Sequence, residues 1–477
     1  MSFGFASERS GSELSHDLGR RLSRDALIVL PDSPHFEELA ERWQDGGRPT
    51  YSVVVVVATE RDVSESVKYA NARGLPFLAT VGGHGTYYGM GRLQNGMAIY
   101  LRNLTQLKLD RDGRSALVGG GLRVDDVIKG LWKIGKQTVT GSCNCVGITS
   151  PALGGGHGFL QGQYGLLADQ ILSARVVLAN GSAITVSDRE HKDLYWGLRG
   201  AGHNFGIVTE MKYKVYDVVR PQWSYVYFTF SGTQIEELYG LLNRMMFLQP
   251  AQATHWSLWL KDAAVDTVHP VISHSILFNG PLRELEKYAK PLYGLKNVGV
   301  YSGVTDYPGL ADVTGYTVDG YLCQYKGKLA MWPSDVETYE VPAIRRWYDL
   351  FDEMVQAEEA LSGSFCLLEG YSTQAVRAVP ADSTAYPHRR QKLLLAPIIH
   401  YMPTGNQTLE AAATNWGSTM RTAAVGSNQR RSYVNYAQGN ETTEAIYGYE
   451  PWRLQKLRTL KRQYDPEGRL SFYAPIA

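Results

Sequence analysis

Residues 52–58 read Ser-Val-Val-Val-Val-Val-Ala, and the helical pattern Val63–Arg73 follows them after a short polar turn. A valine run that leads into an amphipathic helical pattern predicts a strand-to-helix unit. A second strand is expected to end near Val81, and a third spans Met97–Leu101. Alternating strand and helix patterns predict an α/β or α+β domain in the first half of the chain.

The pattern changes further along the chain. Strands predicted at Ser173–Ala179 and Ser182–Val186 are separated by Asn180-Gly181, which is typical of a hairpin turn. From about Pro221 to Gln429, aromatic strands alternate with longer amphipathic helices. We expect this stretch to form a second, substrate-facing domain.

Composition excludes several classes of function. The 477 residues are 44% hydrophobic and 20% charged, with a formal net charge of +1 and no long run of either sign. The chain therefore lacks the basic surface that binding to nucleic acid or to anionic membranes requires. It has no apolar stretch of about 18 residues, so no membrane span is expected. A small-molecule substrate fits best, and the oligomeric state stays open.

The sequence says less about the compartment and about the role of the cysteines. Residues 1–10 have no continuous apolar segment, which favours the cytoplasm by default, or secretion if a signal peptide once preceded them. Glycosylation acceptor sequences at Asn103, Asn180, Asn406 and Asn440 do not settle the compartment. The four cysteines, Cys143, Cys145, Cys323 and Cys366, are too few for a disulfide framework to hold the chain, so any special chemistry is expected on one or two of them. We predict no metal site.

Two glycine-rich loops indicate a cofactor. Gly82-Gly83-His84-Gly85 follows a predicted strand, and Gly154-Gly155-Gly156-His157-Gly158 follows Cys143 by eleven residues. Paired glycines let backbone N–H groups approach a pyrophosphate closely. Neither loop has the spacing of a Rossmann dinucleotide fingerprint, and each loop alone is equally compatible with a structural turn.

Taken together with later motifs, these loops give the chain a clear resemblance. It resembles the berberine-bridge-enzyme-like (BBE-like) oxidases of the vanillyl-alcohol-oxidase superfamily over nearly its whole length. The shared motifs are the loop ending at His84, Cys143-x-x-Val146-Gly147, the Gly154–Gly158 run, Tyr164-Gly165-Leu166, Leu198–Thr209, Tyr386-Pro387-His388-Arg389, Tyr433-Val434-Asn435-Tyr436 and Tyr464-Asp465-Pro466.

The resemblance implies an α+β fold. It consists of a two-lobed PCMH-type FAD-binding domain and a substrate domain whose antiparallel sheet is covered by helices. The implied boundaries are an N-terminal segment at 1–48, the FAD domain at 49–219, the substrate domain at 220–430, and a C-terminal segment at 431–477 that returns to the FAD domain.

The resemblance also implies FAD attached by two covalent bonds. His84 would bond the flavin 8α-methyl and Cys143 would bond flavin carbon 6, because imidazole and thiolate are suitable nucleophiles for these positions. Cys145 is a close alternative, and both cysteines could instead be small packing residues. The residues implied to contact FAD are His84, Cys143, Gly82, Gly83, Gly85, Val146, Gly147, Gly154, Gly155, Gly156, Gly158, Asn204, Gly206, Ile207, Val208, Tyr433 and Asn435.

Catalysis in the resembling family couples hydride transfer to the flavin with removal of a substrate proton. Tyr436 is the first candidate for the base, although a tyrosine needs help to act near neutral pH. The chain departs from the family pattern at Ala396 and Pro397, where many relatives have a Glu or Gln. We therefore name Glu369 and His400 as replacement acid/base candidates, with ordinary buried polar roles as the alternative.

Three functions remain open from the sequence. A bulky specialised metabolite could be dehydrogenated or oxidatively cyclised, with molecular oxygen as acceptor and hydrogen peroxide as product. The resemblance implies the oxidase reaction, because in that family a small residue at the position of Val146 favours oxygen access to the flavin. A carbohydrate or alcohol oxidase is the second possibility. The third is a flavoprotein whose pocket catalyses a pericyclic or cyclisation step.

Overall fold

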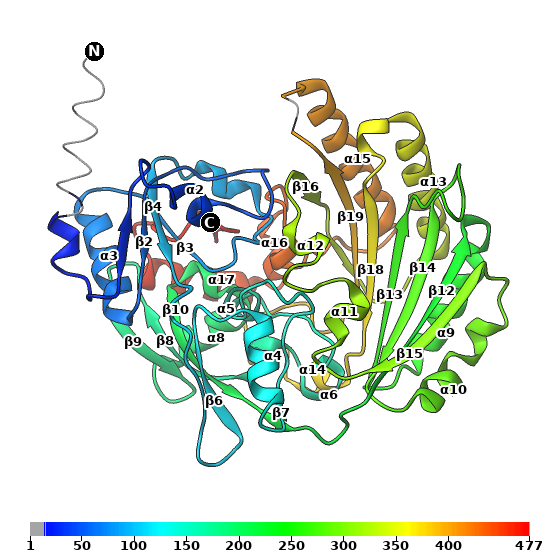
Figure 1. Cartoon of the computed structure of the whole chain (residues 1–477), viewed down its shortest axis with the longest axis horizontal. Coiled ribbons are helices and arrows are strands. Elements are labelled where there is room, and N and C mark those ends of the chain that lie inside the picture. The colour runs from blue at the N-terminus through cyan, green and yellow to red at the C-terminus, as the bar shows by residue number, and fades with distance from the viewer. Residues whose placement is uncertain (1–13, 15, 404, 477) are drawn as a thin grey trace.

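The computed structural model describes residues 14, 16–403 and 405–476. Figure 1 shows two halves side by side: one contains the first β-strands and the C-terminus, and the other is built around one large sheet. Of the predicted N-terminal segment 1–48, residues 1–13 and 15 lie outside the described residues. Among the described residues, no helix combines the length and apolarity that crossing a bilayer requires.

The valine run forms the centre of a four-stranded sheet. Val53–Val57 are buried, and β2 pairs in parallel with β4, which pairs in parallel with β3. Helix α3 follows β2 directly because Thr59 and Asp62 form a reciprocal capping box at its start. The elements are β1 (Leu27–Val29), α2 (Phe36–Ala40), β2 (Tyr51–Val56), α3 (Glu60–Ala72), β3 (Phe77–Thr80) and β4 (Gly96–Tyr100), in the sheet order β1-β2-β4-β3.

A second, antiparallel sheet completes this half. The predicted hairpin at Asn180-Gly181 is confirmed, with Gly181 in the left-handed region at φ +82°. Its strands are β5 (Leu107–Leu109), β6 (Ser115–Gly119), β10 (Ile207–Lys214), β8 (Ile171–Val177) and β9 (Ala183–Ser187) in spatial order. The neighbouring elements are α4 (Val124–Trp132), β7 (Lys136–Gln137), α5 (Thr149–Leu153), α6 (Gln161–Tyr164), α7 (Leu167–Gln170), α8 (Lys192–Ala201) and β11 (Tyr216–Asp217).

The other half is an antiparallel sheet of eight strands. Its order is β15-β12-β14-β13-β18-β19-β16, and β17 also pairs with β19. The strands are β12 (Trp223–Ser231), β13 (Ala253–Leu260), β14 (Val271–Phe278), β15 (Gly299–Thr305), β16 (Lys328–Met331), β17 (Ser334–Val336), β18 (Phe365–Tyr371) and β19 (Leu393–Tyr401). The α+β class and the large sheet predicted from the sequence are confirmed.

The two faces of the large sheet have different partners. Helices α9 (Ile235–Phe247), α10 (Leu282–Tyr293), α13 (Val341–Ala357) and α15 (Gln407–Val425) lie on its outer side in Figure 1. They bury an apolar cluster that includes Trp259, Trp347 and Leu368. Because side chains alternate along a strand, Leu367 and Glu369 point to the opposite face, toward the first half.

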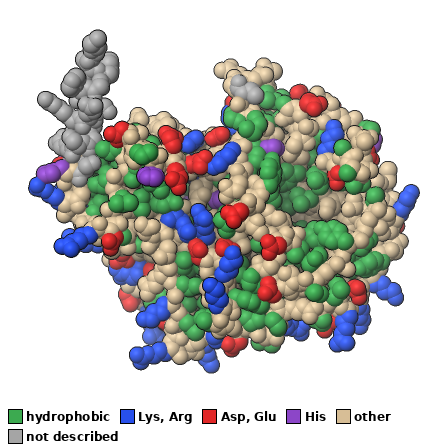
Figure 2. Space-filling view, viewed as in Figure 1, with side chains coloured by type: hydrophobic (Ala, Val, Ile, Leu, Met, Phe, Trp, Pro, Cys, Tyr) green, Lys and Arg blue, Asp and Glu red, His purple; other side chains and the backbone are tan. Residues whose placement is uncertain are grey.

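The C-terminal segment crosses back to the first half. Helix α17 (Pro451–Tyr464) packs against α8, and Lys461 Nζ donates a hydrogen bond to the carbonyl oxygen of Asn204 at 3.1 Å. The remaining short helices are α11 (Leu310–Thr314), α12 (Tyr321–Gln324), α14 (Gln374–Ala378) and α16 (Thr443–Tyr447). Figure 2 shows acidic and basic side chains interspersed on one face of the molecule and a notch between the two halves.

Candidate active site

A cavity of about 470 Å³ lies between the two halves. The first half contributes the loop after β3, the loop 141–147 and residues 206–208. The large sheet contributes Leu329, Met331, Leu367 and Ile398, which belong to one apolar cluster on its inner face. The volume is in the range of small-molecule sites in proteins.

The Gly82–Gly85 loop presents its backbone to this cavity. Gly83 has φ +69°, and a Cβ atom at Gly82 would lie 2.9 Å from the carbonyl oxygen of Cys145, so a side chain there would displace the neighbouring loop. His84 lines the cavity, with its ring centroid 5.3 Å from that of Trp43. Burial, together with the nearby Arg123 and Arg42, lowers the pKa of His84 to about 4, so the imidazole is neutral at neutral pH.

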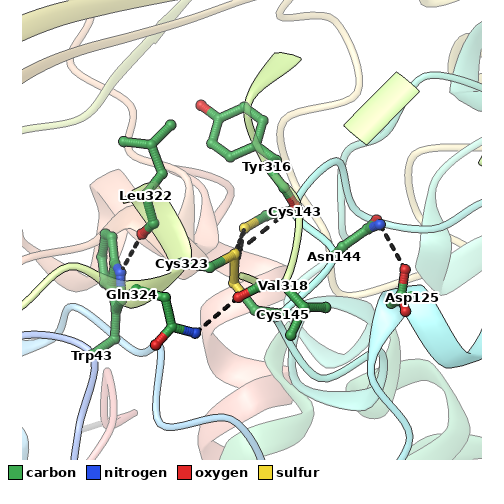
Figure 3. The surroundings of a disulfide bond; sticks show 10 residues. All are labelled: Trp43, Asp125, Cys143, Asn144, Cys145, Tyr316, Val318, Leu322, Cys323 and Gln324. Atoms are coloured by element: carbon green, nitrogen blue, oxygen red, sulfur yellow. Dashed lines mark hydrogen bonds between the residues drawn. A yellow bond between two sulfur atoms is a disulfide. The ribbon is translucent and has the colours of Figure 1, made fainter. Parts of the chain in front are cut away.

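The two neighbouring cysteines have different states. Cys145 is joined to Cys323 by a disulfide, whereas Cys143 is a free thiol that lines the cavity (Figure 3). Burial raises the pKa of the Cys143 thiol to about 11. Of the two cysteines weighed from the sequence, Cys143 is therefore the one with a thiol available to a ligand. The disulfide was not expected, because its partners are 178 residues apart.

Tyr436 and Glu369 meet at the cavity wall. The Tyr436 hydroxyl donates to Glu369 Oε2 at 3.0 Å, and the Tyr371 hydroxyl donates to Glu369 Oε1 at 3.1 Å. Both tyrosines line the cavity, and Glu369 lies directly behind them with 1% of its surface exposed. Burial raises the pKa of Glu369 to about 7, while the two phenols act in the opposite direction. The pKa of Tyr436 is raised well above its usual value, also by burial.

His157 was not predicted as a site residue, although it lies within the glycine run. It lines the cavity, and its ring stacks on Tyr371 with centroids 5.5 Å apart. Burial lowers its pKa to about 4. Since Nδ1 lies 2.9 Å from Gln161 Oε1, the neutral ring donates there and accepts at Nε2 from the Tyr386 hydroxyl, 2.8 Å away.

His400 also lines the cavity but lies apart from Glu369. Leu394 is the cross-strand partner of Glu369, and His400 is six residues further along β19, a distance of about 20 Å. His400 Nδ1 lies 3.1 Å from the Gly363 carbonyl oxygen, and its ring meets Tyr325 edge to face. Burial lowers the pKa of His400. Of the three acid/base candidates, the structure thus brings Tyr436 and Glu369 together and leaves His400 apart.

The predicted cofactor residues divide into two groups. Those that line the cavity are His84, Cys143, Gly82, Gly83, Gly85, Val146, Gly147, Gly206, Ile207, Val208, Tyr433 and Asn435. Those that do not line it are Gly154, Gly155, Gly156, Gly158 and Asn204.

The second group packs closely against other parts of the protein. A Cβ atom at Gly154 would lie 2.2 Å from Asn435 Oδ1, and one at Gly155 would lie 2.4 Å from the Tyr386 ring. A Cβ atom at Gly156 would overlap the Leu167 side chain, and one at Gly158 would overlap the carbonyl oxygen of Thr140. The Asn204 side chain bonds the Tyr447 hydroxyl and the backbone of the C-terminal segment. These residues shape the elements behind the cavity, which the spacing of glycines in a sequence does not distinguish from ligand contact.

Arg42 is a further cavity residue that sequence reasoning missed. Its Nη2 donates to the Gly85 carbonyl oxygen at 2.6 Å, and its side chain is 6% exposed. Burial lowers the pKa of the Arg42 guanidinium, and the nearby Tyr51 and Tyr473 oppose this. A buried guanidinium beside a glycine loop is suited to an anionic ligand group. The sequence has no local motif that marks it.

The cavity fits an extended, partly anionic cofactor. It offers glycine backbone and a buried guanidinium at one loop, and a neutral imidazole and a free thiol as two nucleophiles in the same space. An aromatic and aliphatic wall faces them. This combination of donors suits a flavin dinucleotide better than a metal ion.

Comparisons with known proteins agree with this interpretation. Residues 51–187 match a family model described as "FAD binding domain". The chain is 39% identical to the FAD-linked oxidoreductase chyH of Penicillium rubens, covering 97% of this chain and 93% of the relative. It is 38% identical to the FAD-linked oxidoreductase chry5 of Gibberella zeae, covering 96% of this chain and 94% of the relative.

Two solved structures share the fold. BBE-like 1 of Physcomitrella patens superposes with a TM-score of 0.84 at 21% identity, over 97% of this chain and 99% of that one. Glucooligosaccharide oxidase of Acremonium strictum, whose structure concerns its 6-S-cysteinyl, 8α-N1-histidyl FAD, gives a TM-score of 0.82 at 21% identity, over 97% and 99%. At these identities the likeness concerns the fold alone.

Proposed function

The chain belongs to the BBE-like FAD-linked oxidoreductases, and on that premise we propose that it is an oxidase of a bulky, largely apolar small molecule. The reaction would be a dehydrogenation or oxidative cyclisation, with molecular oxygen as acceptor and hydrogen peroxide as product. The observation that carries the proposal is the hydrogen bond from Tyr436 to Glu369, at the wall of the cavity that contains His84 and Cys143.

His84 and Cys143 hold FAD through two covalent bonds in this proposal. Support comes from their shared cavity, from the neutral state of His84 and from the free thiol of Cys143. Arg42 and the Gly82–Gly85 backbone are suited to the pyrophosphate. When bound, FAD supplies an acceptor for the hydride and transfers electrons to oxygen.

Tyr436 and Glu369 remove the substrate proton as a pair. Burial makes tyrosinate unfavourable, so Tyr436 alone is a poor base near neutral pH. Glu369 has a pKa of about 7 and accepts the Tyr436 hydrogen bond, so it takes the phenolic proton while Tyr436 takes one from the substrate. Tyr371 holds the other carboxylate oxygen and orients Glu369.

The cavity wall favours an apolar substrate. Leu329, Met331, Phe365, Leu367 and Ile398 supply most of the sheet side, and they present no hydrogen-bonding group to a sugar. Aromatic residues of the segment between β15 and β16 extend this wall. Val146 lines the cavity beside Cys143 and, as a small residue, supports access of oxygen to the flavin.

The proposal is tested with purified protein in two steps. Acid precipitation separates covalent from released flavin, and a yellow pellet is expected for the wild type and for each of His84→Ala and Cys143→Ala, whereas the double variant should release its flavin.

An anaerobic panel of benzylic alcohols, allylic alcohols and gluco-oligosaccharides is then scored by bleaching of the flavin absorbance, followed by peroxide detection in air. Bleaching by the apolar alcohols supports the proposal. Bleaching by oligosaccharides alone would contradict the substrate class, and flavin reduced without peroxide formation in air would contradict the oxidase assignment.

A further inference from the structure

Three sulfur atoms meet beside the cavity. Cys143 Sγ lies 3.4 Å from Cys145 Sγ and 3.6 Å from Cys323 Sγ, while Cys145 and Cys323 are bonded to each other (Figure 3). Cys145 and Cys323 are buried, and Cys143 is half-buried and faces the cavity. A free thiol in van der Waals contact with both sulfurs of a disulfide is close enough for thiol–disulfide exchange once its side chain rotates to bring the three sulfurs into line.

The disulfide fastens a segment that forms part of the cavity wall. We call residues 306–327, which connect β15 to β16, the strap. Besides the disulfide, several polar contacts hold it to the first half. Near the disulfide, Asn144 N donates to the Tyr316 carbonyl oxygen at 3.1 Å. Trp43 Nε1 donates to the Leu322 carbonyl oxygen at 2.6 Å (Figure 3). Strap residues Tyr316, Tyr321, Leu322 and Tyr325 line the cavity.

We propose that Cys143, Cys145 and Cys323 form a thiol–disulfide exchange site that decides which of the two loop cysteines is free to face the cavity. The Cys143 thiolate attacks Cys323 Sγ, a Cys143–Cys323 bond forms, and the Cys145–Cys323 bond breaks. The electron pair leaves with Cys145, which takes up the proton that Cys143 lost. The number of thiols and disulfides is unchanged, so no oxidant or reductant is consumed.

Both disulfide isomers keep the strap fastened, because Cys143 and Cys145 belong to the same loop. They differ in the free thiol. Cys143 lines the cavity, whereas Cys145 does not. A bond between Cys143 and flavin can form in only one isomer, and once formed it removes the nucleophile and fixes the pairing. This consequence rests on the proposed function, whereas the exchange itself does not.

The surroundings of Cys143 make the exchange slow at neutral pH. The thiolate is the attacking species, and burial raises the pKa of Cys143 to about 11, although the backbone N–H groups of Cys145 and Val146 partly oppose this. Burial raises the pKa of Tyr316 of the strap, and Glu369 and Cys143 raise it further. The Cys145–Cys323 isomer is therefore expected to exchange slowly at neutral pH and faster as the pH rises.

Non-reducing peptide mapping tests the site without relying on activity. Cys145→Ser leaves Cys143 and Cys323 as neighbouring thiols, and with oxidised glutathione as oxidant they should form a disulfide. Most Cys143 peptide should then be linked to the Cys323 peptide, and the Cys143–flavin mass should be lost. Cys145→Ser/Cys323→Ser removes the competing thiol and should restore free or flavin-bound Cys143. Cys366→Ser, at a buried cysteine in β18, is the matched control and should leave all pairings unchanged.

The possible outcomes distinguish the exchange site from the proposed Cys143–flavin bond. Independent alkylation of Cys143 and Cys323 in folded Cys145→Ser, with no cross-link after treatment with oxidised glutathione, would overturn the exchange site. If wild-type Cys143 carries no flavin but Cys145→Ser still forms the Cys143–Cys323 link, the exchange site holds and the flavin bond fails. Should Cys145→Ser not fold, wild-type protein with unattached Cys143 is mapped after incubation at alkaline pH and acid quenching. There, appearance of the Cys143–Cys323 peptide supports the site and its absence overturns it.

Discussion

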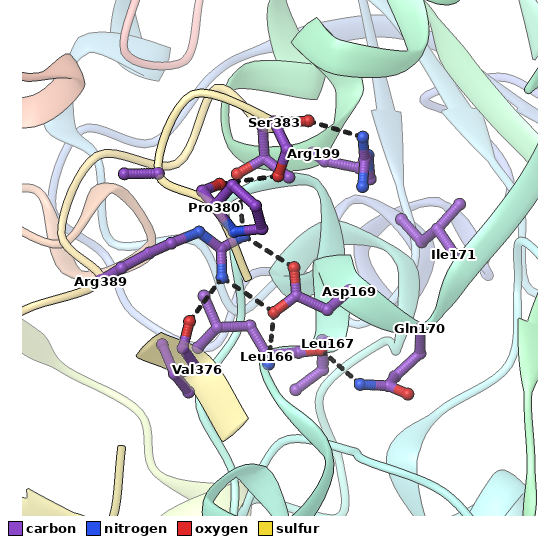
Figure 4. A network of polar contacts seen from close by, with 12 residues as sticks. Leu166, Leu167, Asp169, Gln170, Ile171, Arg199, Val376, Pro380, Ser383 and Arg389 are labelled. Atoms are coloured by element: carbon purple, nitrogen blue, oxygen red, sulfur yellow. Dashed lines mark hydrogen bonds and ion pairs between the residues drawn. The ribbon is translucent and has the colours of Figure 1, made fainter. Parts of the chain in front are cut away.

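Asp169 and Glu369 are both buried carboxylates, and their surroundings differ. Asp169 receives two hydrogen bonds from Arg389, at 2.7 and 3.0 Å, and one from the backbone N–H of Leu166 (Figure 4). Glu369 instead receives hydrogen bonds from the phenols of Tyr436 and Tyr371. A carboxylate paired with a guanidinium joins the elements that carry the two groups, whereas one held by phenols in an apolar setting is poised to take up a proton.

The two carboxylates also lie in different parts of the fold. The Asp169–Arg389 pair links α7 of the first half to the loop before β19, and Arg389 also donates to Val376 of α14 and to Thr384 of that loop. The Glu369 cluster lies on the inner face of the large sheet, directly behind the cavity wall. We therefore expect changes at Arg389 to affect folding and changes around Glu369 to affect the reaction.

The largest effect is expected for Tyr436→Phe. Loss of the hydroxyl removes the group that takes the substrate proton, so the rate of flavin reduction should fall by about 10²–10⁴-fold. Stopped-flow absorbance under anaerobic conditions measures this rate with whichever panel compound bleaches the wild type. Tyr371→Phe is the matched control, and it should lose less because Tyr371 orients Glu369 without relaying the proton. Equal losses in the two variants would contradict the assigned roles.

Arg389→Met should destabilise the fold without a specific effect on the reaction. It leaves Asp169 buried without its cation, which costs about 3–5 kcal/mol of unfolding free energy. Urea unfolding followed by circular dichroism measures the loss. The double variant Asp169→Leu/Arg389→Met should recover much of it, and a double variant as unstable as the single one would show that the pair is not the cause.

Glu369→Gln should have the opposite effect on stability. The pKa of Glu369 is about 7 in the folded protein and about 4.3 in an unfolded chain, so the folded state holds the proton more tightly. Stability associated with this group is complete below about pH 4 and is lost as the pH rises to about 7. Neutral glutamine removes that loss, so the free energy of unfolding of Glu369→Gln at about pH 8 should exceed that of the wild type by up to about 3 kcal/mol.

Asp169→Asn is the control for this variant. It replaces a carboxylate that has a cation, so it should lower stability at the same pH. Stabilisation by Asp169→Asn, or destabilisation by Glu369→Gln at alkaline pH, would mean that the two carboxylates do not differ as described.

The smallest effect is expected for His400→Ala. Its ring is about 20 Å along the strand from the position opposite Glu369 and bonds only a backbone carbonyl among the described residues. The pH dependence of flavin reduction should be unchanged. Loss of the pH dependence of flavin reduction in His400→Ala would mean that His400, and not Glu369, is the acid/base group.

Much of the fold could be predicted from local patterns. The valine run, the Asn180-Gly181 hairpin and the alternating aromatic strands each report on neighbouring residues, and the structure confirms the α+β class with its large antiparallel sheet. Motif spacing also directed attention to His84, Cys143 and Tyr436, which share one cavity.

What the sequence could not supply depends on contacts between distant segments. The Cys145–Cys323 disulfide joins residues 178 apart, and the Tyr436–Glu369 hydrogen bond joins residues 67 apart. The glycine run 154–158 was assigned to the cofactor, but close approach to protein atoms explains those glycines as well. Arg42 has no recognisable motif, because its role comes from burial beside Gly85.

The pH dependence of anaerobic flavin reduction, compared between the wild type and Glu369→Gln, tests most directly whether Glu369 receives the proton from Tyr436. The wild-type rate should rise with pH and level off above about pH 7, because Glu369 must be ionised to accept the proton. Glu369→Gln should be slower at every pH and should lack that rise. The same rise through about pH 7 in both proteins would contradict the account.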